Sequence, residues 1–118
     1  MTIQECYQSL GGNFAEVQQR LPSDRLIKRF ITKFLDDGSY AELSRAMGSD
    51  QREQAFRATH TLKGVCANLS LGALERSSSA LTEALRPREG NAEIAPLAEK
   101  MMDDYAMTIA ALREYFAE

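Results

Sequence analysis

Apolar residues recur at intervals of three and four along nearly the whole chain, which is the spacing of one face of an α-helix. No segment alternates apolar and polar residues over the length of a strand. Gly and Pro, which disfavour helix interiors, number only 7 and 3 in 118 residues. The pattern therefore predicts helices separated by short breaks. The expected helices cover residues 2–10, 14–21, 24–35, 39–47, 51–69 and 71–86, followed by a loop over 87–91 and a last helix that starts between Asn91 and Pro96.

Several of the breaks carry residues that commonly cap helix N-termini, because a short polar side chain accepts a hydrogen bond from a free backbone N–H of the first turn. We expect Asn13 to cap the second helix and Ser23 the third. Ser49 or Asp50 is expected to cap the helix over 51–69, and Ser70 the helix that follows it.

Each of the longer helices carries an apolar stripe, which a globular protein buries against other helices. Four substantial helices joined by short loops predict an all-α fold, an antiparallel four-helix bundle with short helical segments at the N-terminus. A chain of 118 residues is large enough for one hydrophobic core and too small for two. We therefore expect a single domain over 1–118, with an N-terminal helical extension over 1–21 and the bundle over 23–117.

Composition and charge narrow the classes of function. A net charge of −3 disfavours binding to nucleic acid through its phosphates. No apolar run approaches the roughly 18 residues of a membrane span, and the first residues lack the basic and apolar regions of a signal peptide. We therefore expect a cytoplasmic protein without a membrane segment. Cys6 and Cys66 lie far apart and lack the spacing of metal ligands, so we expect buried thiols and no metal site.

The helix over 51–69 contains His60, the single histidine of the chain. At about 100° per residue, one side of this helix is uniformly apolar or small and is the expected core face. That face comprises Ala55, Ala58, Leu62, Val65 and Leu69, with Cys66 at its margin. His60 lies on the opposite side, which argues against a hydrogen-bonded core histidine. The simplest alternative is a surface histidine without a role, and its neighbours weigh against that alternative.

Two neighbours of His60 suggest phosphoryl chemistry. Neutral imidazole can attack phosphorus near pH 7, and Lys63, three residues on, can offset the negative charge of the product. Gly64 costs about 1 kcal/mol relative to Ala in a helix interior, which suggests that its missing side chain lets another molecule approach. Phe56 and Ala67 lie on the same side and would offer that molecule an apolar surface.

Other chemistries find less support. One histidine without a nearby cysteine cannot supply a zinc site by itself. No glycine-rich phosphate loop is present, because Gly11-Gly12 lacks the required spacing and lysine, so we expect no ATP site and no kinase activity. No set of an acid, a histidine and a nucleophile occurs at a recognisable spacing. Because a catalytic triad is assembled in space, the sequence leaves this alternative open.

The segment over 58–69, with the sequence ATHTLKGVCANL, resembles the signature of histidine-containing phosphotransfer (HPt) domains of bacterial phosphorelays. That signature reads His-x-Leu-Lys-Gly, followed by small residues and then Asn-Leu. The order and lengths of the helices extend the resemblance over roughly Ser23 to Phe116. The run over 55–58 is also similar to the approach to the phosphohistidine in chemotaxis-kinase phosphotransfer domains, which share the fold. The family often has Gly directly after Asn-Leu, where this chain has Ser70.

The resemblance implies a four-helix bundle that relays phosphoryl groups between aspartates of receiver domains. His60 matches the phosphorylated residue, Lys63 its basic neighbour, and Gly64 the small residue that gives access. We expect His60 to accept the group on Nε2, with Phe56, Arg57 and Ala67 helping a partner to dock. The expected partners are response-regulator receiver domains, a hybrid histidine kinase, or both.

We therefore expect a monomeric phosphoryl carrier that is not an enzyme and binds no cofactor, because the Mg²⁺ that the transfer needs would sit in the receiver. Two alternatives remain open. The chain could be a non-catalytic helical binding module that sequesters a partner through the same face. It could also be a phosphotransfer module that serves a chemotaxis-type kinase.

Overall fold

The computed structural model describes residues 1–86 and 93–117. Every regular element in these residues is an α-helix, which confirms the prediction of an all-α fold. The helices are α1 (Ile3–Ser9), α2 (Phe14–Arg20), α3 (Asp24–Leu35), α4 (Ser39–Gly48), α5 (Arg52–Asn68), α6 (Gly72–Leu85) and α7 (Ile94–Ala117).

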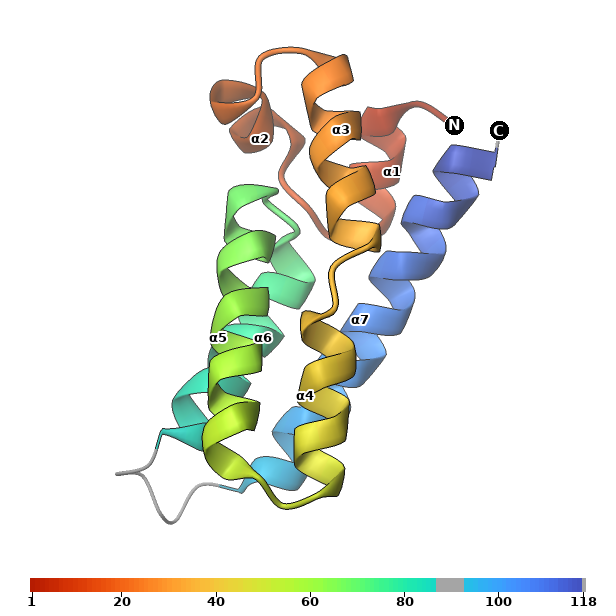
Figure 1. The fold of residues 1–118 in the computed structure, drawn as a ribbon. Helices are drawn as coiled ribbons and strands as arrows, with labels where there is room; N and C mark the ends of the chain where they lie inside the picture. The colour runs from red at the N-terminus through yellow and green to blue at the C-terminus, as the bar shows by residue number, and fades with distance from the viewer. Residues whose placement is uncertain (87–92, 118) are drawn as a thin grey trace.

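The longer helices form the expected four-helix bundle (Figure 1). Helices α3 and α4 follow one another along one side of the molecule, and α5, α6 and α7 form the other columns. Helix α5 packs against both α4 and α6, and α6 packs against α7. Stacked rings of Tyr40 and Tyr105, with centroids 3.7 Å apart, join α4 to α7 and close the bundle.

The core is built from the apolar stripes of these helices. Its largest fully buried side chains include Ile27 and Ile31 from α3, Leu43 from α4, and Leu81 from α6. Removing such a side chain from water contributes about 1.5–3 kcal/mol. Burial of these stripes therefore holds α3 to α7 in the arrangement that presents α5.

The core face of α5 largely agrees with the expected one. Ala55, Ala58, Leu62 and Leu69 are at most 6% exposed, as predicted. Val65 is only half-buried, because it faces a groove between α3 and α5. Cys66 was expected at the margin of the face and Thr59 was not assigned to it, yet both are completely buried. The core stripe of α5 is thus rotated toward α6. The expectation of buried thiols is met by both Cys66 and Cys6.

Two of the predicted N-caps are confirmed, since the side chains of Asn13 and Ser23 accept hydrogen bonds from the first turns of α2 and α3. The predictions for α5 and α6 were wrong. Their N-cap residues are Gln51 and Leu71, and neither makes a side-chain cap.

The capping predictions failed because Asp50 and Ser70 end the preceding helices. Both residues have left-handed backbone angles, with φ of 56° and 53°. The N–H of Ser70 donates to the carbonyl of Ala67, and the N–H of Leu71 donates to the carbonyl of Cys66. This hydrogen-bond pair is a Schellman motif, which closes a helix C-terminus around a residue of positive φ. A residue used in this way has neither the extended backbone nor the free side chain of an N-cap.

The last helix starts at Ile94, within the predicted interval, and Pro96 lies in its first turn, where proline is tolerated. The loop predicted over 87–91 lies outside the described residues.

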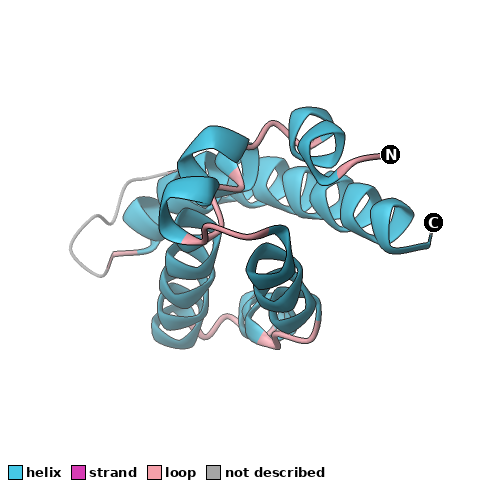
Figure 2. Ribbon diagram, turned by 90° about the horizontal axis from the view of Figure 1, so that it is seen from above, coloured by secondary structure: helices cyan, strands magenta, loops and turns pink. Residues whose placement is uncertain are grey.

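The N-terminal helices α1 and α2 lie at the end of the bundle where α5 ends and α6 begins (Figures 1 and 2). The hydroxyl of the buried Tyr7 donates to the carbonyl of Leu69 at 2.8 Å, and the N–H of Asn13 donates to the carbonyl of Ser70 at 2.9 Å. Residues 1–21 therefore bind the end of α5 directly.

Candidate functional site

His60 lies near the middle of α5 with its side chain exposed to solvent, which agrees with its predicted place opposite the core face. Its ring lies beside that of Phe56, one turn earlier, with centroids 5.9 Å apart and planes inclined at 44°. Phe56 is half-buried and His60 is exposed. The imidazole is therefore supported from one side by an aromatic ring and open to a partner from the other.

Hydrogen bonds to α6 hold α5 in place at its start and its middle. The guanidinium of Arg52 donates to the carbonyls of Ala84 and Leu85 at 3.0 and 3.2 Å, where a cation complements the dipole at the C-terminus of α6. Next to His60, the buried hydroxyl of Thr59 accepts a hydrogen bond from the hydroxyl of Thr82 at 3.3 Å. These bonds set the register of α5 against α6.

A second set of bonds holds the end of α5. Arg20 from α2 donates through Nη2 to the carbonyl of Ala67 at 2.8 Å and through Nε to the carbonyl of Asn68 at 3.1 Å. It also hydrogen-bonds the hydroxyl of Ser70, which in turn donates to the carboxylate of Glu16 at 2.7 Å. Carbonyls at a helix C-terminus lack helical partners. Here Arg20 donates to two of them, and that of Ala67 also accepts from the N–H of Ser70.

The side of the His60 face toward α6 is charged. Glu83 follows Thr82 on α6, and its carboxylate accepts two hydrogen bonds from Arg86 at 2.8 and 3.1 Å. The guanidinium of Arg86 also lies over the ring of Phe56, 5.4 Å from its centroid. The hydrogen bonds from Arg86 lower the pKa of the Glu83 carboxyl, and the positive charges of Lys63 and of protonated His60 lower it further. The charges of Arg86, Lys63 and His60 thus all act on the carboxylate of Glu83.

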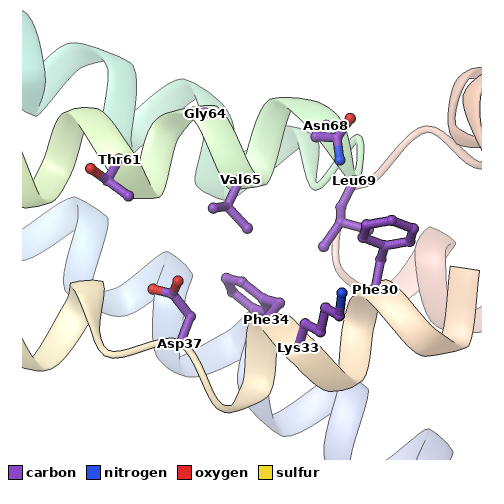
Figure 3. Close-up of a pocket in the computed structure, with 9 residues that line it drawn as sticks. All are labelled: Phe30, Lys33, Phe34, Asp37, Thr61, Gly64, Val65, Asn68 and Leu69. Carbon is purple, nitrogen blue, oxygen red and sulfur yellow. The ribbon is translucent and has the colours of Figure 1, made fainter.

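On the side of α5 that faces α3, a groove lies next to Gly64. This groove of about 380 Å³ runs between α3 and α5, and Gly64 lies on its wall (Figure 3). Phe30, Lys33 and Phe34 from α3 line the opposite wall, and Val65 points toward Phe34. Apart from its chain neighbours and the backbone of its own helix, no described residue has a heavy atom within 4 Å of where a Cβ on Gly64 would stand.

The remaining predicted docking residues lie on different parts of this surface. Arg57 is exposed, and its guanidinium pairs with the carboxylate of Glu53 at 2.5 Å. It lines a second groove together with Glu42 from α4. Ala67 is half-buried, one turn beyond Lys63. Phe56 and Arg57 therefore precede His60 along α5, and Ala67 follows it two turns later.

Sequence reasoning missed the neighbours of His60 that other helices supply. Glu83 comes from α6 and Arg86 from the residue that ends it, and Phe30 and Lys33 of α3 line the groove beside Gly64. The only available signal was the spacing of three between Glu83 and Arg86, which is typical of any ion pair on a helix surface. It carried no information about the distance to His60.

The described residues contain no group of three or more His, Cys, Asp or Glu side chains that could hold a metal ion. None of the helices in ranges 1–86 and 93–117 is long and apolar enough to cross a membrane.

The fold and this face of α5 define a helical bundle that presents a solvent-facing histidine beside a lysine and a glycine. The chain belongs to the Hpt domain family, whose model matches residues 25–115. Hpt domains are phosphoryl carriers, and membership implies histidine phosphotransfer in a phosphorelay. Neither a search of the curated proteins nor a search of the solved structures gave a match.

Proposed function

We propose that His60 is the residue through which this Hpt domain relays a phosphoryl group between aspartates of receiver domains. The observation that carries the proposal is the placement of the chain's single histidine, which lies exposed on α5 beside Lys63 and next to the open space at Gly64. Membership in the family supplies the class of chemistry.

The transfer requires a neutral imidazole and an in-line approach of the phosphoryl donor. Nε2 of His60, with the ring proton on Nδ1, attacks the phosphorus of an aspartyl phosphate. The new P–N bond forms as the acyl P–O bond breaks, and the bonding electron pair leaves with the aspartate carboxylate. The ring then carries the phosphoryl group and releases its proton to solvent, and Lys63 offsets part of the added negative charge.

The receiver would dock over the surface that surrounds His60. Gly64 lets the receiver backbone approach α5, and the groove beside it accepts a protruding element of the partner. Phe56 and Ala67 contribute apolar contact area, and Arg57 a positive charge. Receivers or a hybrid histidine kinase are the proposed partners, and the Mg²⁺ for the transfer would belong to the receiver.

The experiment is incubation with a panel of receiver domains, each phosphorylated on its aspartate. We expect label on this chain that is stable in alkali and labile in acid, as for a phosphoramidate, and no such label on His60→Gln. A wild-type chain that remains unlabelled, or a His60→Gln chain that is still labelled, contradicts the proposal. Retention of partner binding by an unlabelled protein would instead indicate a sequestering module.

The access role of Gly64 is tested in the same assay. Gly64→Leu should slow transfer at least tenfold while circular dichroism shows an unchanged helix content, because the new side chain occupies the space a partner needs. Gly64→Ala is the matched control and should retain most of the rate. Equal rates for Gly64→Leu and the wild type would show that no partner approaches this point.

A further inference from the structure

One acidic side chain on α6, Glu83, interacts through its charge with the proposed phosphoryl acceptor, and the relay chemistry described above does not use it. Glu83 lies on α6 immediately after Thr82, whose hydroxyl bonds Thr59, the residue before His60. This register places Glu83 at the level of His60. The phosphoryl group to be held there adds roughly 1.5–2 negative charges, so a carboxylate at this position opposes it.

Arg86 only partly screens this carboxylate. Its guanidinium donates two hydrogen bonds to Glu83 and lies over the Phe56 ring, which in turn lies against the ring of His60. The pair is on the surface, with 57% of the Glu83 side chain exposed. Exposed ion pairs interact weakly in water, so the carboxylate keeps much of its influence on nearby charges.

We propose that Glu83 is a negative charge that weakens the hold of this domain on a phosphoryl group at His60 and so keeps the group ready for onward transfer. Lys63 and Arg86 act in the opposite sense. The balance of these three charges sets how strongly the domain competes with a receiver aspartate. The inference rests on the proposed role of His60 and adds the residue that tunes it.

The magnitude follows from charge interactions near a protein surface. We consider a carboxylate that lies about one Debye length from an incoming phosphoryl anion. Removing its negative charge changes the rate or the equilibrium of phosphorylation by roughly two- to fourfold. The same change should nearly vanish at 1 M salt, where the Debye length is about 3 Å. A purely structural role of Glu83 would not depend on salt in this way.

The test uses potassium phosphoramidate, a small anionic phosphodonor, so that it does not depend on any partner protein. In this reaction the donor P–N bond breaks as a new P–N bond forms to His60, and the ring proton ends on the departing ammonia. We expect Glu83→Gln to be phosphorylated two to four times faster than the wild type at 20 mM salt and equally fast at 1 M salt. Glu114→Gln is the control, because Glu114 is also an exposed carboxylate but lies near the C-terminal end of α7, where its charge acts on Cys6 of α1.

Equal rates for Glu83→Gln and the wild type at low salt would overturn the proposal. A second comparison in an Arg86→Gln background separates the carboxylate from its partner. Glu83→Gln should again accelerate phosphorylation, by at least the same factor. Loss of the acceleration in that background would show that Glu83 acts only by holding Arg86, and would also overturn the proposal. Because no receiver is involved, a failure here is distinct from a failure of the receiver assay above.

Discussion

We expect Gly64 to give a partner protein access to His60 while it lowers the free energy of unfolding. The substitution Gly64→Ala measures that loss of stability. Gly64 lies in the interior of α5, where Gly is less favourable than Ala by about 0.8–1 kcal/mol. A methyl group at this position meets open space. The full helix-propensity gain should therefore appear in the folded protein, and Gly64→Ala should raise the free energy of unfolding by about 0.5–1 kcal/mol.

Gly72 is the matched control, because it is also a glycine within a helix, at the start of α6. A Cβ on Gly72 would stand 2.6 Å from the carbonyl oxygen of Gly11, which belongs to the turn between α1 and α2. A backbone oxygen cannot move aside as a flexible side chain can, so Gly72→Ala should force α1 and α2 away from α6. Overpacking of this kind destabilises a protein by about 1–3 kcal/mol.

The assay is urea unfolding followed by circular dichroism, with the thermal midpoint as a second readout. For a domain of this size, Gly64→Ala should raise the midpoint by about 2–5 °C and Gly72→Ala should lower it by at least as much. A destabilised Gly64→Ala protein would refute the reasoning, since it would mean that the space at Gly64 is filled in the folded chain. Equal effects of the two substitutions would refute the claim that Gly72 packs on Gly11.

Two further predictions concern the end of α5. Arg20→Ala should lower the free energy of unfolding by about 1–2 kcal/mol, because the carbonyls of Ala67 and Asn68 lose their hydrogen bonds from the guanidinium. Arg25→Ala on the exposed side of α3 is the control, and equal urea midpoints for the two variants would contradict the capping role. Burial raises the pKa of the Cys66 thiol to about 12, above the pKa of a thiol in the unfolded chain, so the thiol stays protonated in the native protein. The stability that comes from burying the neutral thiol is therefore lost only as the pH rises from about 9 to 12. In a Cys6→Ser variant, a thiol reagent at pH 8 should therefore label Cys66 only at the rate of unfolding, and rapid labelling without urea would show that the thiol is accessible.

Much of the fold could be predicted from periodicity, because an amphipathic helix encodes its buried face within a few residues of sequence. Helices α2 to α6 begin and end within two residues of their predicted limits. The caps at Asn13 and Ser23 were predictable because capping is local. The capping roles assigned to Asp50 and Ser70 were wrong because two helices meet at each of these residues, and the pattern does not say which helix the residue serves.

Ser70 shows how distant residues settle such a choice. Its left-handed backbone favours glycine, which is the residue the family often has after Asn-Leu. Here the serine hydroxyl bonds Glu16 and Arg20, and its carbonyl accepts from Asn13. Those partners lie about 50 residues earlier in the chain, so no local rule could have identified them.

The sequence by itself determined the family signature, most of the core stripe of α5 and the exposure of His60, because each depends on residues within a few helical turns of one another. Only the tertiary structure decided what surrounds that histidine. Glu83 and Arg86 reach its edge through the register of α6, the groove at Gly64 needs the wall supplied by α3, and Arg20 closes the end of α5 from α2. These neighbours are separated along the chain by 20 residues or more, and only the burial of the helices against one common core brings them together.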